Sequence, residues 1–254
     1  MLFNYHTHTA RCNHASGTDR EYVEQAIVGG LKTLGFSDHA PYIFPDGQYP
    51  SEHRMKPDEI FEYAENIRSL AKEYEKDIRI LCGFELEYYP DYHTDEMAFL
   101  RQVKPDYLIL GQHFIGNEYS LLSSSRSLVG NDLGLIAHVT QVIAALATGD
   151  FDYLAHPDVA GRSFSEETMA REYRRLCRAA KRFHVPLEIN LLGIRSGRHY
   201  PSNEFFKIAV EEGNDVILGT DAHNPYVVCD PESEAQALKM VQTLGLHLLD
   251  KLDI

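Results

Sequence analysis

The amino-acid sequence predicts an α/β fold of seven βα units around a parallel sheet, and three observations carry this prediction. Short apolar runs alternate with longer segments whose apolar residues recur at helical spacing. Most of the short runs are apolar nearly throughout, as in parallel strands that are covered on both faces. The 254 residues contain no repeat, low-complexity tract or linker-like stretch, so we expect one domain over residues 1–254. The expected strands are 3–6, 33–38, 78–85, 106–112, 152–156, 186–191 and 215–220.

The first two helices are predicted by their starts and by one apolar face. Thr18 and Glu21 form the pattern of a capping box, which predicts a helix that ends near Gly29. A second helix follows Pro57, because proline is tolerated in the first turn of a helix. Its apolar face consists of Ile60, Tyr63, Ala64, Ile67, Leu70, Ala71 and Tyr74.

The second half of the chain contains two further helix signals. Ser165 is predicted to cap a third helix, and Ser233 is predicted to open a last helix that stops near Gly245. The polar segments 40–56 and 114–131 are predicted to be long loops that act as lids or walls of a site rather than as domain boundaries.

Composition and charge speak against several classes of protein. With 44% hydrophobic and 24% charged residues the chain has an ordinary globular composition, unlike a disordered, collagen-like or coiled-coil chain. Its formal net charge of −14 would repel a nucleic-acid backbone or an anionic membrane, so neither is expected as a partner. The four cysteines form no close pair, and there is no signal peptide or long apolar span, so we expect a cytoplasmic protein. The sequence does not predict an oligomeric state.

Seven of the thirteen histidines lie at or just after the ends of expected strands. Two carboxylates share this placement, Glu85 and Asp221. In a closed parallel barrel all strand carboxyl ends emerge on one face, so these side chains are expected to meet in one pocket. The seven histidines are His6, His8, His14, His39, His113, His156 and His223.

These residue types and their spacing predict a metal site. Residues two apart in extended chain point to the same side, so His6 and His8 form one pair and Asp221 and His223 another. Imidazole with carboxylate suits zinc, iron or manganese, and the number of ligands exceeds what one tetrahedral ion can use. Two or three divalent ions are therefore expected.

Several alternatives accompany this interpretation. A lone His-x-His is equally consistent with two surface histidines, although seven such placements together are not. Cys12 could bind a metal, but the role of a small buried hydrophobe is preferred. Glu85 or Glu87 could bridge two ions; Glu85 is preferred because it lies nearer the strand end, and Glu87 is then a residue that supports the site. A surface or packing role is expected for the histidines without strand-end placement, which are His53, His93, His138, His184, His199 and His247.

Arginines in loops on the same expected face predict a phosphorylated substrate. Arg162 lies six residues after His156, and Arg195 and Arg198 follow the sixth expected strand. Guanidinium groups match the geometry of a phosphate. The alternative for each of them is an ordinary solvated arginine.

The motifs together resemble the polymerase and histidinol phosphatase (PHP) superfamily, in particular its histidinol-phosphate phosphatase branch, over nearly the whole chain. The resemblance implies a distorted seven-stranded, TIM-like barrel with three metal ions. It implies the ligand sets His6, His8, Glu85 and Asp221 for one ion, Glu85, His113 and His156 for a second, and His14, His39 and His223 for a third. The matching motifs are His6-Thr7-His8-Thr9, Cys12-Asn13-His14, Ser37-Asp38-His39-Ala40-Pro41, Gly83-Phe84-Glu85-Leu86-Glu87, Gln112-His113, Ala155-His156-Pro157-Asp158, Glu188-Ile189-Asn190 and Gly219-Thr220-Asp221-Ala222-His223.

One position departs from the family pattern, because the more common first motif has an aspartate where this chain offers His14. The expected reaction is hydrolysis of L-histidinol phosphate in histidine biosynthesis, with a metal-bridging hydroxide as nucleophile and arginines that neutralise the phosphoryl oxygens. Asp158 is the candidate general acid and His199 its alternative, although Asp158 could equally cap the following turn. The candidate substrate-binding residues are Arg162, Arg195, Arg198, Gln112, Asn190, Tyr42, Phe114 and Tyr119, the three aromatic ones by stacking on an imidazole.

Other functions stay open at this point. A PHP phosphoesterase could act on another small phosphate monoester or a nucleotide. A metal-dependent 3′–5′ exonuclease or a polymerase editing module is disfavoured by the acidic composition. A metal-binding or sensory protein without turnover is disfavoured by the complete ligand set and the loop arginines.

Overall fold

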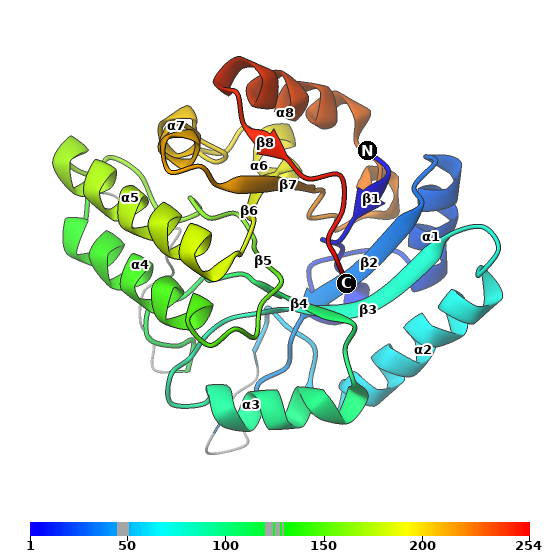
Figure 1. Cartoon of the computed structure of the whole chain (residues 1–254). Helices are drawn as coiled ribbons and strands as arrows, with labels where there is room; N and C mark the ends of the chain where they lie inside the picture. The colour runs from blue at the N-terminus through cyan, green and yellow to red at the C-terminus, as the bar shows by residue number, and fades with distance from the viewer. Residues whose placement is uncertain (45–50, 120–123, 125–127, 129) are drawn as a thin grey trace.

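The computed structural model describes residues 1–44, 51–119, 124, 128 and 130–254. Its centre is a curled parallel sheet in which the strands lie side by side in chain order, with helices on the outside (Figure 1). The expected α/β barrel in a single domain is confirmed. The strands are β1 Phe3–Asn4, β2 Thr33–His39, β3 Arg79–Leu86, β4 Tyr107–Leu110, β5 Tyr153–Leu154, β6 Leu187–Asn190, β7 Asp215–Gly219 and β8 His247–Leu248.

The eighth strand was not predicted, and it changes only one end of the barrel. Its two residues pair with the first two residues of β7, at the amino end of the sheet. At the carboxyl end, Thr7 and Ala222 form a parallel bridge between the segments that follow β1 and β7. The barrel is therefore closed by the seven predicted strands at its carboxyl end, and β8 adds to the sheet only at the opposite end.

The helices of the described residues begin and end largely where their caps predict. The capping box of Thr18 and Glu21 is present, Ser165 accepts a bond from the backbone of Thr168, and Gly245 ends the last helix with φ 75°. The helices are α1 Asp19–Val28, α2 Ile60–Glu73, α3 His93–Leu100, α4 Asp132–Leu146, α5 Glu166–Phe183, α6 Leu191–Arg195, α7 Asn203–Glu211 and α8 Pro231–Leu244.

One predicted helix start was wrong. Helix α8 begins at Pro231 rather than at Ser233. Asp230 is its cap, because the Asp230 carboxylate accepts a hydrogen bond from the backbone nitrogen of Ser233 at 3.0 Å. The short helices α3, α6 and α7 and the longer α4 have no counterpart among the predicted elements.

The two predicted loops are described in part. Residues 45–50 of the first, and residues 120–123, 125–127 and 129 of the second, lie outside the described residues. The first loop leads into a short 3-10 helix at Pro57–Glu59, directly before α2. In the second loop, Phe114 forms an antiparallel bridge with Ser124.

The inside of the barrel is filled with side chains of the described residues, so the strand-end histidines lie over a packed interior. Tyr107 lies across the interior and donates a hydrogen bond to the carbonyl of Tyr5 at 2.7 Å. Gly35 and Gly83 make room for it, since a Cβ atom at either position would lie 2.4–2.5 Å from the Tyr107 side chain. Leu252, near the chain end, packs into the same cluster.

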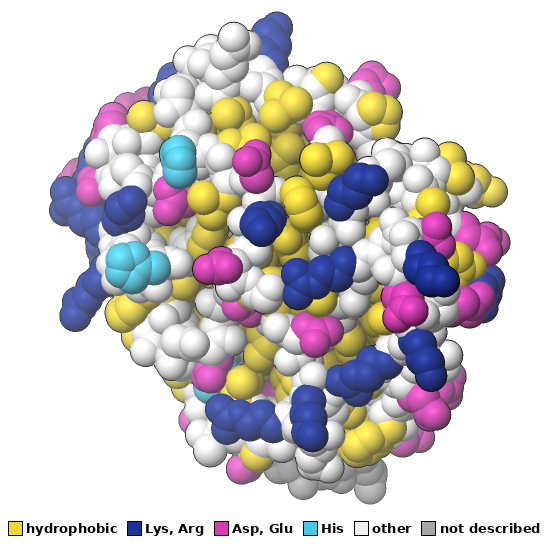
Figure 2. Space-filling view, turned by 45° about the vertical axis from the view of Figure 1, so that its right-hand side comes forward, with side chains coloured by type: hydrophobic (Ala, Val, Ile, Leu, Met, Phe, Trp, Pro, Cys, Tyr) yellow, Lys and Arg dark blue, Asp and Glu magenta, His cyan; other side chains and the backbone are white. Residues whose placement is uncertain are grey.

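Two observations concern the outside of the molecule. On the face drawn in Figure 2, basic and acidic side chains are interspersed rather than gathered into a basic stripe. None of the helices within the described residues is both long and apolar enough to cross a membrane.

Candidate metal centre

The predicted ligands do meet at the carboxyl ends of the strands, and Glu85 lies at their centre. This side chain is 1% exposed at the end of β3. Its two oxygens face imidazoles that come from four different strand ends. Oε2 lies 2.9 Å from His39 Nδ1, 3.5 Å from His8 Nε2 and 3.7 Å from His6 Nε2, and Oε1 lies 2.9 Å from His156 Nε2 and 3.8 Å from His113 Nε2.

Asp221 is the second carboxylate of the cluster. Its Oδ1 lies 3.3 Å from His8 Nε2, 3.7 Å from His6 Nε2 and 3.3 Å from His223 Nδ1. Asp221 has φ 48° and His156 has φ 30°, a region in which residues other than glycine are strained. Such strain typically costs about 1–3 kcal/mol and is retained at functional sites, where it directs a side chain.

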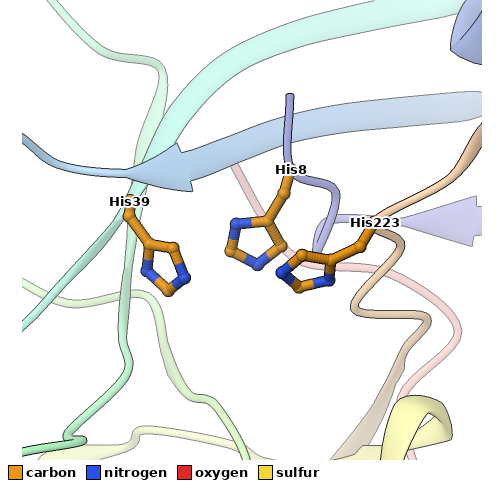
Figure 3. A group of neighbouring side chains, drawn as sticks. All are labelled: His8, His39 and His223. Carbon is orange, nitrogen blue, oxygen red and sulfur yellow. The ribbon is translucent and has the colours of Figure 1, made fainter. Parts of the chain in front are cut away.

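A third group of imidazoles lies toward the outside. The ligand atoms of His8, His39 and His223 are all within 4.8 Å of one another, and Figure 3 shows the ring of His8 between those of His39 and His223. His14 is exposed and groups with His223 and Cys12. Its ring centroid lies 4.8 Å from that of His223 and 5.4 Å from that of His39, so His14, His39 and His223 are neighbours as expected.

The donor set fits divalent metal ions. Four buried ligand atoms in the cluster lack a hydrogen-bond partner among the described residues: Nε2 of His6, Nδ1 and Nε2 of His8, and Oε2 of Glu85. Each unpaired buried polar atom costs about 1–3 kcal/mol, a cost that a bound cation removes. Mixed imidazole and carboxylate donors suit zinc, iron or manganese.

Three of the histidines each have a buried carboxylate near the ring nitrogen Nδ1, and at His8 this contact has the length of an ion pair without hydrogen-bond geometry. Glu188 Oε1 lies 2.7 Å from His6, Asp38 Oδ1 lies 3.5 Å from His8, and Glu87 Oε1 lies 3.3 Å from His113. A carboxylate at Nδ1 fixes the ring and leaves Nε2 for a metal.

The sequence interpretation placed Glu87 in such a supporting role but missed Asp38 and Glu188. Both stand in motifs at strand ends that were singled out, Ser37-Asp38-His39 and Glu188-Ile189-Asn190. The available signal was a carboxylate in a buried strand, which for Asp38 also stands next to the ligand position His39.

Burial and charge set the protonation of the cluster. Burial lowers the pKa of His6 and of His8, but the surrounding carboxylates outweigh it and raise both pKa values, that of His8 to about 9. Burial prevails at His39 and His223, whose pKa values fall to about 3. The imidazoles of His39 and His223 are therefore neutral at neutral pH and can donate a lone pair to a cation.

Of the three predicted arginines, Arg198 lies on the wall of the cavity that the cluster borders. This cavity is lined by His14, His39, Glu85, His113, His156, Leu192, Arg198, Asp221 and His223. The expectation that Arg195 faces a substrate was wrong, because its Nη1 and Nη2 donate to the backbone carbonyls of Thr220 and Asp221, both at 2.7 Å. Arg162 is exposed and does not line the cavity.

Gln112 and Asn190 belong to the framework rather than to a substrate site, contrary to expectation. Asn190 Nδ2 donates to Asp221 Oδ2 at 3.0 Å and to Glu188 Oε2 at 2.8 Å. Gln112 accepts from the backbone nitrogen of Tyr88 at 2.9 Å and donates to the carbonyl of Phe114 at 2.7 Å.

The three predicted aromatic residues differ in position. Phe114 lines a second cavity, which shares His14, His39 and His113 with the first. Tyr42 is buried and donates to the carbonyl of Glu87, and Tyr119 stacks on Phe44 at a centroid distance of 5.4 Å. Neither tyrosine lines these two cavities, so the expected stacking on a substrate is restricted to Phe114.

Neither of the two candidate proton donors, Asp158 and His199, is among the residues that line this cavity. Asp158 is buried, and its Oδ2 accepts from the backbone nitrogen of Ser202 at 2.6 Å. Its Oδ1 has no partner among the described residues, and burial raises its pKa to about 6. His199 Nε2 lies 3.2 Å from the carbonyl of Val159.

Comparison with known proteins places these observations in a family. The PHP domain model matches residues 4–191. A probable histidinol-phosphatase of Deinococcus radiodurans is 28% identical over 88% of this chain and 87% of its own length. A probable histidinol-phosphatase of Schizosaccharomyces pombe is 26% identical over 90% of this chain and 82% of its own.

Among solved structures, the histidinol phosphate phosphatase of Lactococcus lactis, complexed with zinc, L-histidinol and phosphate, has the same fold. Its TM-score is 0.75 at 19% identity, over 99% of this chain and 96% of that one. Because the family model matches well over half of the sequence, the chain belongs to the PHP domain family.

Proposed function

We propose that the chain is a metal-dependent phosphomonoesterase that hydrolyses L-histidinol phosphate to L-histidinol and phosphate, a step of histidine biosynthesis, and that residues 1–254 form one phosphatase domain. The observation that carries this proposal is the cluster around Glu85, which faces a cavity with Arg198 on its wall. The names of the Deinococcus and Schizosaccharomyces relatives support the choice of substrate.

The proposed metal content is three divalent ions, zinc, iron or manganese. His6, His8, Glu85 and Asp221 would hold the first ion, Glu85, His113 and His156 the second, and His14, His39 and His223 the third. Bound ions of this kind lower the pKa of water and neutralise phosphoryl oxygens. The buried, unpaired ligand atoms of His6, His8 and Glu85 support this assignment.

The chain's own residues supply the rest of the chemistry. In this proposal Arg198 binds the phosphoryl group. Two observations support this role: Arg198 lines the cavity, and its guanidinium donates a hydrogen bond to the hydroxyl of Tyr200 at 2.5 Å. Asn190 donates to the carboxylate of Asp221, and Arg195 donates to its backbone carbonyl, so both fix the position of Asp221. The leaving alkoxide needs a proton, and Asp158 is the proposed donor because its Oδ1 is buried without a partner among the described residues.

A substrate panel tests the proposal. Purified protein loaded with zinc or manganese is assayed for phosphate release from histidinol phosphate, other small monoesters, a nucleotide and nitrophenyl phosphate. We expect rates on histidinol phosphate tens of times above the rest, and loss of release with Glu85→Gln. Equal rates on all esters would contradict histidinol phosphate as the specific substrate but keep the assignment as a phosphatase. The absence of phosphate release from every ester would refute that assignment.

A further inference from the structure

Arg54 is a buried arginine in the loop before α2, and none of the functional roles above uses it. Its side chain is 3% exposed. Nε and Nη2 donate to Glu118 Oε2 at 2.9 and 2.6 Å, and Nη1 donates to the carbonyl of Ala40 at 2.9 Å. The guanidinium also lies over the ring of Tyr42, 5.3 Å from its centroid. These contacts hold Arg54 in one place between the two long loops.

The same guanidinium reaches toward the metal centre through one carboxylate. Arg54 Nη2 lies 3.4 Å from Glu87 Oε1, and that oxygen lies 3.3 Å from His113 Nδ1. The other oxygen of Glu87 accepts from the backbone nitrogen of Phe114 at 3.1 Å. One oxygen of Glu87 is therefore shared between Arg54 and a metal-ligand candidate.

This arrangement distinguishes His113 from His6 and His8. Each of the three rings has a carboxylate near Nδ1: Glu188 for His6, Asp38 for His8 and Glu87 for His113. Within the described residues, an arginine lies at ion-pair distance from Glu87 but not from Glu188 or Asp38. Arg54 in turn is held by Glu118, which belongs to the loop that follows His113. The position of the His113 ring thus depends on residues of both long loops.

We propose that Arg54 is a positioning residue that orients His113 through Glu87 and so couples the loops around the cavity to the ion bound by Glu85, His113 and His156. This inference deepens the proposed function and depends on it for the identity of that ion. Without the guanidinium, Glu87 loses the contact that fixes its shared oxygen, and the Nδ1 contact that orients His113 loosens with it. Removal of such an outer partner typically costs about 10- to 100-fold in metal affinity.

The test counts zinc rather than turnover. Wild type and Arg54→Met are loaded with zinc and dialysed against graded concentrations of a competing chelator, and the retained zinc is counted by mass spectrometry. In the variant one ion is expected to leave at about 10- to 100-fold lower chelator concentration, while the others leave as in wild type. Glu118→Gln, which keeps the pair of Arg54 and Glu87, is expected to weaken the same ion by a smaller factor.

Arg20→Met is the matched control, because Arg20 also pairs with a glutamate, Glu73, but at an exposed place on the surface. If Arg54→Met does not fold, Arg54→Lys takes its place, since lysine keeps the charge but cannot form the forked contact. Selective weakening of one ion supports the proposal. Retention of every ion at wild-type affinity, or equal weakening of all of them, overturns it and leaves the phosphatase proposal intact, which the substrate panel on wild type decides separately.

Discussion

Replacing Glu188 with glutamine should weaken metal binding without unfolding the chain. The Glu188 carboxylate is completely buried and faces donors on both sides. Oε1 lies 2.7 Å from His6 Nδ1, and Oε2 accepts from the backbone nitrogen of His156 at 2.9 Å and from Asn190 Nδ2 at 2.8 Å. Glutamine keeps the shape but exchanges one oxygen for an NH2 group, so at least one of these donors then faces another donor.

Two typical magnitudes give the expected loss of metal affinity in Glu188→Gln. Loss of the partner of a ligating histidine typically lowers metal affinity about 10- to 100-fold, which corresponds to about 1.4–2.7 kcal/mol. A hydrogen bond to a charged group contributes about 1.5–3 kcal/mol. The two ranges agree, so we expect the ion held by His6 to bind about 10- to 100-fold more weakly in Glu188→Gln.

The assay is a zinc titration against a competing chelator, with circular dichroism of each metal-free protein to verify its fold. Glu172→Gln is a matched control, because Glu172 is also buried but pairs with Arg171 and Arg175 on α5 rather than with a ligand. We expect Glu172→Gln to keep wild-type zinc affinity. Raising the zinc concentration should restore hydrolysis in Glu188→Gln. A folded Glu188→Gln variant with wild-type zinc affinity would show that Glu188 does not support the ion held by His6.

Four further predictions concern other parts of the molecule. Arg198→Met should lower kcat/KM on histidinol phosphate by about 30-fold, since a charge-assisted hydrogen bond contributes about 2 kcal/mol; unchanged steady-state kinetics would show that this arginine does not bind the phosphoryl group. Gly111→Ala should lower the zinc content of the purified protein, because a Cβ atom there would lie 1.8 Å from Glu85 Oε1; a full zinc complement would contradict this. Asp158→Asn should slow histidinol phosphate hydrolysis more than nitrophenyl phosphate hydrolysis, whose leaving group needs no proton; an equal loss on both esters removes Asp158 from the role of acid. Burial raises the pKa of Glu96 to about 8, so between the ordinary glutamate pKa and about pH 8 the folded chain keeps a proton that the unfolded chain has lost, and the stability of the fold falls as pH rises. The Tm of Glu96→Gln should therefore fall less than the Tm of wild type over this pH range. Tm curves that stay parallel would exclude the effect.

The strands and the ligand cluster could be predicted because both depend on local patterns. Apolar runs located the seven main strands, but several of them end earlier than predicted. The predicted strand 152–156 is reduced to Tyr153–Leu154, and the predicted strand 215–220 ends at Gly219. Two residues after the end of each strand, the backbone has a positive φ, at His156 after the first strand and at Asp221 after the second. There the chain leaves the sheet, and the side chain of that residue belongs to the ligand cluster.

Other elements could not be predicted because their sequence patterns are weak or obscured by neighbouring residues. Helix α4 buries Leu135, Val139 and Val142 at helical spacing, but the exposed Leu133 beside them obscures the contrast between its two faces. Strand β8 consists of two residues, too few for a periodic pattern. The role of Arg195, and the bond of Asn190 to Asp221, depend on residues more than 20 positions away, which no local pattern contains.

The closure of the barrel explains why ligands from opposite ends of the chain hold a fixed relation. His8 N donates to the carbonyl of Ala222 at 2.9 Å, and Ala222 N donates to the carbonyl of His6 at 3.2 Å. These two bonds join His6 and His8 directly to the segment that contains Asp221 and His223. Because β8 pairs with β7 only at the amino end, it leaves this junction intact. The same contact that closes the sheet therefore sets the spacing of four ligands.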